Sequence, residues 1–116
     1  MKIRRGHVAN SSTTCFLCDT TESVEQVKDF IDEALRLVEG DDTDTEPRRY
    51  NAICTVEPYT RAISDDLDGW RNYYSIPTPR EGMVCIMGTD DNSIPWEIQE
   101  IIENHHKLGA TRLHLG

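Results

Sequence analysis

Four carboxylates in this sequence have the type and the placement to do chemistry. Asp19, Glu57, Asp90 and Asp91 each stand at or soon after the end of an apolar run that is typical of a β-strand. If the strands run parallel, their carboxyl ends meet at one edge of the sheet, where open α/β sheets bind their ligands. Carboxylates there could hold Mg2+, which could then act on a phosphate. The competing interpretation is structural, because Asp before a helix is an ordinary cap and Glu57 is also simply the end of a strand before Pro58.

The cysteines argue against a zinc or thiol-redox centre. Cys15 and Cys18 have the C-x-x-C spacing of such sites, but they stand in a strand-like run, where residues three apart point to opposite faces. Cys54 and Cys85 each stand alone in the middle of a predicted strand, where a free cysteine packs as a small apolar residue. We therefore expect no Zn2+ site and four reduced thiols, as in a cytoplasmic protein.

The negative charge of the chain is concentrated in one stretch. The 116 residues include 12 basic and 21 acidic ones, for a net charge of -9. Residues 19–46 alone hold 11 of the acids and two of the bases. This balance argues against direct nucleic-acid binding, which rests on Lys and Arg at the phosphates. An acidic surface is ordinarily just solvated, and less often it meets a basic partner.

Four residues form the predicted interaction surface. Asp29, Asp32 and Glu33 lie on the side of a helix over residues 23–39 that is opposite its apolar residues, so we expect them to face solvent. Trp96 stands in the first turn of a later helix, where an exposed ring could anchor a partner. The competing interpretation places Trp96 in the core.

Periodicity and cap signals define the elements that must position these side chains. Ser23 and Gln26 fit a capping box at the start of the helix over 23–39, and Gly40 is a natural stop. A second helix is predicted from Pro58 to about residue 74, and a third from an N-cap at Ser93 to Gly109. Short apolar or alternating runs predict four strands, at residues 13–18, 50–57, 83–87 and 111–115.

The alternation of strands and helices predicts one α/β domain over residues 1–116. We expect a four-stranded, mainly parallel sheet with three helices, the run 83–87 in its middle, and an acidic loop at 40–49. The alternative is a ferredoxin-like α+β domain with a mixed sheet. Since no apolar run is long enough to span a bilayer, we expect no membrane segment and a cytoplasmic location.

The beginning of the chain resembles a motif of many small phage and prokaryotic proteins. In that motif Gly-Phe-Val precedes Ser-Asn and a run of serines that ends in Phe, and residues 4–16 here read RRGHVANSSTTCF. His7 replaces the Phe and Ala9 the Ser, whereas the matching residues are Gly6, Val8, Asn10, Ser11, Ser12 and Phe16. The ending of the chain, with DNSIP before the last helix and RLHLG at the close, also looks like that of proteins in this group. The resemblance implies a phage or prophage origin and carries no catalytic residue.

Three functions follow from these observations. The leading hypothesis is a non-enzymatic phage or prophage accessory protein that acts through its acidic surface, by binding another protein or by self-association as a homodimer. The first alternative is a small divalent-metal-dependent phosphoesterase or nucleotide-binding protein that uses the four carboxylates. The second is an acidic mimic of nucleic acid that occupies the basic groove of a host enzyme.

Overall fold

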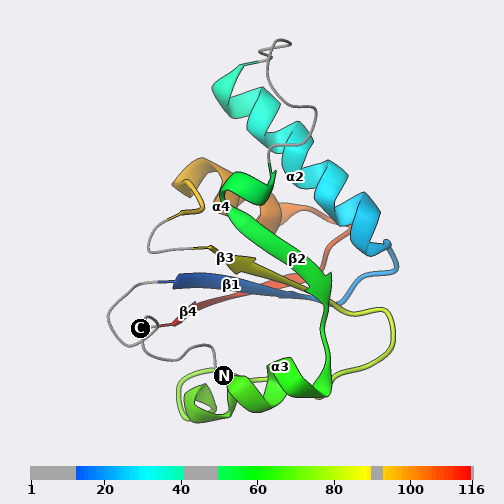
Figure 1. Ribbon diagram of the computed structural model, residues 1–116, viewed down its shortest axis with the longest axis vertical. Helices are drawn as coiled ribbons and strands as arrows, with labels where there is room; N and C mark the ends of the chain where they lie inside the picture. The colour runs from blue at the N-terminus through cyan, green and yellow to red at the C-terminus, as the bar shows by residue number, and fades with distance from the viewer. Residues whose placement is uncertain (1–12, 41–49, 90–92, 116) are drawn as a thin grey trace.

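An antiparallel sheet forms the centre of the protein. The computed structural model describes residues 13–40, 50–89 and 93–115. Its sheet has the strand order β2-β3-β1-β4 (Figure 1), with the strands β1 (Thr13–Cys18), β2 (Cys54–Pro58), β3 (Val84–Gly88) and β4 (Ala110–Leu115). Every pair of neighbouring strands is antiparallel. The predicted mainly parallel sheet is therefore wrong, and the sheet is not mixed either, so the fold is an α+β domain.

The connections explain why the parallel prediction fails. The long helix α2 (Val24–Glu39) links β1 to β2, and α4 (Trp96–Asn104) links β3 to β4. In each case the two linked strands run in the same direction, but another strand lies between them. This split β-α-β arrangement is the connectivity of ferredoxin-like domains. Alternating strand and helix signals are the same for split and for adjacent crossovers, so the sequence pattern does not separate them.

Two layers cover the two faces of the sheet (Figure 1). We call α2 and α4 the helix layer, and it packs on one face over a core that includes Phe16, Ile31, Ile86, Ile98 and Ile102. The opposite face is covered by the α3 layer, which consists of α3 (Arg61–Asp66), a 3-10 turn over Asp68–Trp70 and the chain up to Met83. Its core includes Leu17, Leu67, Ile76, Leu113 and Leu115. All six residues of β1 are buried because both layers cover it.

Helix α2 begins and ends where the local signals predict. The hydroxyl of Ser23 accepts a hydrogen bond from the backbone N–H of Gln26 at 3.1 Å. The side-chain carbonyl of Gln26 accepts one from the backbone N–H of Ser23 at 2.8 Å. The predicted capping box is therefore confirmed. Gly40, with φ of 90°, donates its N–H to the carbonyl of Arg36 at 2.9 Å and ends the helix.

Other boundaries differ from the prediction: α3 begins at Arg61 rather than at Pro58, which belongs to β2, and α4 ends at Asn104 rather than at Gly109. The second helix is broken, because α3 ends at Asp66 and only the 3-10 turn follows it. In the third helix Ser93 is not the N-cap: its hydroxyl donates to the carbonyl of Ile53 at 2.7 Å, and α4 starts after Pro95. Residues 50–52 form a 3-10 turn rather than the start of β2. None of the helices in the described ranges has the length and apolar character that a bilayer crossing needs.

Candidate functional site

Two of the four carboxylates of the predicted metal site, Asp19 and Glu57, belong to the described residues, and both lie at the ends of strands that run in the same direction. Asp19 follows β1, and Glu57 lies near the end of β2, which runs in the same direction as β1. β3 runs the opposite way and ends at Gly88, beside the start of β2 at Cys54. Thr89, which follows β3, therefore lies at the opposite edge of the sheet from Asp19 and Glu57, and Asp90 and Asp91 lie outside the described residues.

Asp19 and Glu57 stand apart from each other as well. The Asp19 carboxylate accepts a hydrogen bond from Arg80, with an Oδ2–Nη2 distance of 2.5 Å, and both side chains are largely exposed. Glu57 is paired with Cys85 on β3, which lies between β2 and β1. Within the described ranges, no three His, Cys, Asp or Glu side chains gather as a metal site would require. Because Asp90 and Asp91 lie outside the described residues, the predicted metal site stays a prediction.

The cysteines lie as their strand positions predict. Cys15 points into the core beneath the α3 layer, whereas Cys18 points into the core beneath the helix layer. All four cysteines are free and buried. Burial raises the pKa of Cys18 and of Cys54 to about 12, so neither is a thiolate near neutral pH. Their arrangement is that of packing residues.

The predicted interaction residues of α2 separate into exposed and buried ones. Asp29 and Glu33 are exposed, as predicted. Asp32 is only 3% exposed, so the prediction that it faces solvent is wrong. Its carboxylate accepts a hydrogen bond from the backbone N–H of Tyr50 at 2.6 Å. Asp32 thus fixes the returning chain to the side of α2 and is not available to a partner.

α4 extends the acidic surface beyond the residues that the sequence singled out. It contributes three exposed glutamates and no basic residue. The two helices pack side by side, with the Phe30 ring 4.5 Å from the His105 ring, and together hold eight acidic and two basic residues. We call their exposed carboxylates the acidic surface: Glu25, Asp29, Glu33, Glu39, Glu97, Glu100 and Glu103. The distribution of charge along the sequence did not reveal the three glutamates of α4, because basic residues elsewhere outside residues 19–46 balance their charge.

Two of the basic side chains beside this surface contact its glutamates. Lys28 forms an ion pair with Glu25 at 3.1 Å, and hydrogen bonds to Glu25 and Tyr50 raise the pKa of the Lys28 ammonium. Arg112, from β4, lies 3.6 Å from the carboxylate of Glu103. Both positive charges are thus held by contacts within the protein, and the carboxylates remain in excess.

Trp96 adds an exposed aromatic ring at the start of α4. Its exposed fraction is 58%, so the interpretation that places it in the core is wrong. The guanidinium carbon of Arg112 lies 5.2 Å from the centre of the Trp96 ring, which holds the ring by a cation–π contact. Trp and Arg are the residue types that most often dominate binding at protein interfaces. The predicted anchor is therefore accessible.

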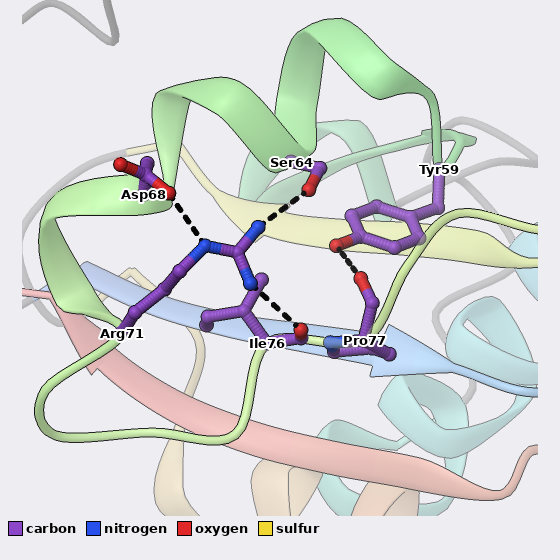
Figure 2. A network of polar contacts seen from close by, with 6 residues as sticks. All are labelled: Tyr59, Ser64, Asp68, Arg71, Ile76 and Pro77. Carbon is purple, nitrogen blue, oxygen red and sulfur yellow. Dashed lines mark hydrogen bonds and ion pairs between the residues drawn. The ribbon is translucent and has the colours of Figure 1, made fainter.

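A polar network on the opposite side of the sheet was not predicted from the sequence. Figure 2 shows the guanidinium of Arg71 between α3 and the chain that follows the 3-10 turn. Its Nε donates to Asp68 at 2.5 Å, one Nη to the buried hydroxyl of Ser64 at 3.1 Å, and the other Nη to the carbonyl of Ile76 at 3.0 Å. We call these four residues the Arg71 network. Since each guanidinium nitrogen already has a partner, the network ties the α3 layer together and does not form an anion site.

Tyr59 reinforces the same layer. Its hydroxyl donates to the carbonyl of Pro77 at 2.7 Å (Figure 2). Burial raises the pKa of Tyr59, although a hydrogen bond with Ser64 and the charge of Arg71 act in the other direction. The phenol therefore stays protonated and serves as a donor. Only the spacing of Asp68 and Arg71, three residues apart, could have pointed to part of this network in the sequence.

Comparison with known proteins identifies no relative of this chain. No protein-family model matches the chain, and no curated protein or solved structure matches it significantly. The resemblance to small phage and prokaryotic proteins stays a prediction. Most of its matching residues, Gly6, Val8, Asn10, Ser11 and Ser12, lie outside the described residues, as does most of the predicted acidic loop.

Proposed function

We propose that this chain is a non-enzymatic phage or prophage accessory protein that binds a basic protein partner through its acidic surface. The observation that supports the proposal is the exposed face of the helix layer. Seven exposed carboxylates from two helices lie on this layer. A positively charged partner would be attracted to it and oriented by it.

Trp96 supports binding over simple solvation. A face that serves only solubility needs no large exposed ring, whereas an interface gains most from a central aromatic residue surrounded by polar ones. Trp96 begins α4, and Glu97, Glu100 and Glu103 follow it on the same helix. We therefore place the apolar anchor of the interface at Trp96 and its charged surroundings on α4 and α2.

Origin and location are part of the proposal. The phage or prophage origin is supported by the resemblance at the beginning of the chain. A cytoplasmic location is supported by the four free, buried thiols, since reduced cysteines are usual there.

An acidic mimic of nucleic acid is the second candidate. The exposed residues Glu25, Asp29 and Glu33 recur every fourth residue along α2 and so form a row of charges about 6 Å apart along the helix axis. A regular row of negative charges is what the basic groove of a nucleic-acid enzyme binds. In this version of the proposal the partner would release the chain when DNA is added.

Charge neutralisation on opposite faces of the protein tests the proposal. The variant Asp29→Asn/Glu33→Gln removes two charges from the acidic surface, and the control Asp65→Asn/Asp66→Asn removes two exposed charges from α3. We expect the first variant to lose proteins that the wild type captures from bacterial lysate at low salt, and the control to keep them. Capture should fall steeply as salt rises. Equal capture by both variants, or capture that salt does not change, would contradict the proposal.

A further inference from the structure

Sulfur-containing side chains gather on the face of the sheet beneath the α3 layer. Met83, Cys85 and Met87 stand at every second position along β3 and the residue before it, so their side chains lie on one face. Cys15, on the neighbouring strand β1, belongs to the same core. Its Sγ lies 3.8 Å from the Sγ of Cys85. One core thus brings together two thiols and two thioethers.

The register of β1 and β3 determines how the two thiols meet. Cys15 is paired with Met87, and Leu17 is paired with Cys85. The two cysteines are therefore diagonal neighbours, whose Cα atoms ordinarily lie about 7 to 8 Å apart. A disulfide that leaves the backbone in place needs Cα atoms less than about 7 Å apart. A direct bond between the sulfurs does not fit this register, although the sulfurs are in contact.

The separation of the sulfurs does fit two thiolates on one metal ion. At a metal–sulfur distance of about 2.3 Å, two thiolates bound at tetrahedral to trigonal angles lie about 3.8 to 4.0 Å apart. Met87 is directly opposite Cys15 and on the same face, so it supplies a third sulfur beside the pair. Its three rotatable side-chain bonds let the thioether adapt to a bound ion.

We propose that Cys15, Cys85 and Met87 form a three-coordinate site for Cu+. Thiolates and thioethers are soft ligands, which select Cu+, whereas structural Zn2+ sites take four ligands from Cys, His and carboxylate side chains. Binding would release both thiol protons to solvent and leave the ion bound by two thiolates and one thioether. The ion binds as Cu+ and stays Cu+, so no electron is transferred.

The burial of these side chains suits such an ion. Cys15 and Cys85 are 0% and 1% exposed, among the apolar side chains of the α3 layer. An apolar shell keeps water away from a bound metal. Met87 is only partly buried, so it is the sulfur that an incoming ion meets first. Since the site would join the two central strands of the sheet, bound Cu+ should also stabilise the fold.

Anaerobic titration of the full chain with Cu+ held by the chromogenic chelator bicinchoninate tests the site. We expect the wild type to take one Cu+ per chain from the chelator and to gain the ultraviolet absorption of Cu+–thiolate bonds. Cys15→Ala should abolish both signals. Cys18→Ala is the matched control, because Cys18 is equally buried but lies beneath the helix layer, and it should bind as the wild type does.

A second matched pair removes a thioether and keeps the size of the side chain. Met87→Leu should lower the affinity for Cu+ about tenfold, because it takes away the third sulfur. Met83→Leu should leave the affinity unchanged. Met83 is on the same face, but the register places it on the other side of Cys85 from the position opposite Cys15. Thermal unfolding without copper checks that each variant is folded.

Three results would overturn the proposal. The first is a wild-type chain that leaves Cu+ with the chelator. The second is equal loss of binding in Cys15→Ala and Cys18→Ala, or equal weakening in the two methionine variants. The third is Zn2+ that binds the same sulfurs as tightly as Cu+ does. None of the substitutions touches the acidic surface, so a failure here is separable from a failure of the proposed function.

Discussion

The two layers that cover the sheet are built on different principles. The helix layer uses helices of 16 and 9 residues with periodic apolar residues, and the longer one, α2, has local caps at both ends. The α3 layer uses six residues of helix, a 3-10 turn and an irregular chain. What holds the irregular part is a small set of side-chain hydrogen bonds centred on Arg71. The first layer is thus stabilised mainly by apolar packing, and the second depends on a few polar contacts as well.

This difference explains which surface is available to a partner. Because apolar contacts hold the helix layer from beneath, its outer face is free to carry one sign of charge together with the exposed ring of Trp96. In the α3 layer the polar groups of Ser64, Asp68 and Arg71 bond to one another. The acidic surface is therefore the better candidate for binding, while the Arg71 network is structural.

The largest effect is expected from removing a core side chain on either side of the sheet. Ile98 and Leu67 are both 0% exposed, one beneath the helix layer and one within the α3 layer. Ile98→Ala and Leu67→Ala should each lower the free energy of unfolding by about 3 kcal/mol, because each leaves a cavity in a packed core. Urea unfolding measures both. If Leu67→Ala cost less than about 1 kcal/mol, the α3 layer would be a loosely held cover and not a second core.

Loss of the Arg71 network should cost less, but it should act on one layer alone. Arg71→Ala leaves the buried Ser64 hydroxyl and the carbonyl of Ile76 without their donor, which should lower the free energy of unfolding by about 2 kcal/mol. The control is Arg80→Ala, whose exposed ion pair with Asp19 should contribute under about 1 kcal/mol.

The cysteines report which layer opens in that variant. Cys15 and Cys85 lie beneath the α3 layer, and Cys18 and Cys54 lie beneath the helix layer. In Arg71→Ala, a thiol reagent should label the first pair well before the second. Labelling of all four at one rate would mean that the two layers open together and that the network has no local role.

A smaller effect is expected at Asp32, where the helix layer has a polar contact of its own. Asp32→Ala removes the acceptor of the Tyr50 N–H and should destabilise the protein by about 1 to 2 kcal/mol. Asp29→Ala, one turn earlier and exposed, should change stability by less than about 0.5 kcal/mol. Equal effects in thermal unfolding would place Asp32 on the surface after all.

Local signals were enough to predict the parts of this fold that depend on neighbours in sequence. The capping box at Ser23, the strand at residues 13–18 and the divergence of Cys15 and Cys18 follow from side chains at most a few positions apart. The antiparallel order could not be predicted in this way, because it depends on which strands meet across the sheet.

The roles of several side chains could not be predicted for the same reason. Asp32 is buried only because the chain returns beside α2 at Tyr50, eighteen residues later. The α4 share of the acidic surface becomes visible only once the two helices lie in one layer. Trp96 is exposed although the sequence favoured a position in the core, because it is the first residue of its helix and is held from outside by Arg112.

The smallest effect is expected in how the stability of the protein depends on pH, through the two thiols beneath the helix layer. The pKa of Cys18 and of Cys54 is about 12 in the folded protein, against 9.0 for an ordinary thiol. Because the folded pKa is raised, the unfolded chain loses these protons first, and stability falls as pH rises from about 9 towards 12. Each thiol should lower the free energy of unfolding by about 1 kcal/mol as the pH rises from about 9 to 10. Cys18→Ala should remove its own share of this slope, measured by urea unfolding at both pH values. A slope that Cys18→Ala leaves unchanged would mean that water reaches this thiol and that the core beneath the helix layer is less tightly closed than the geometry indicates.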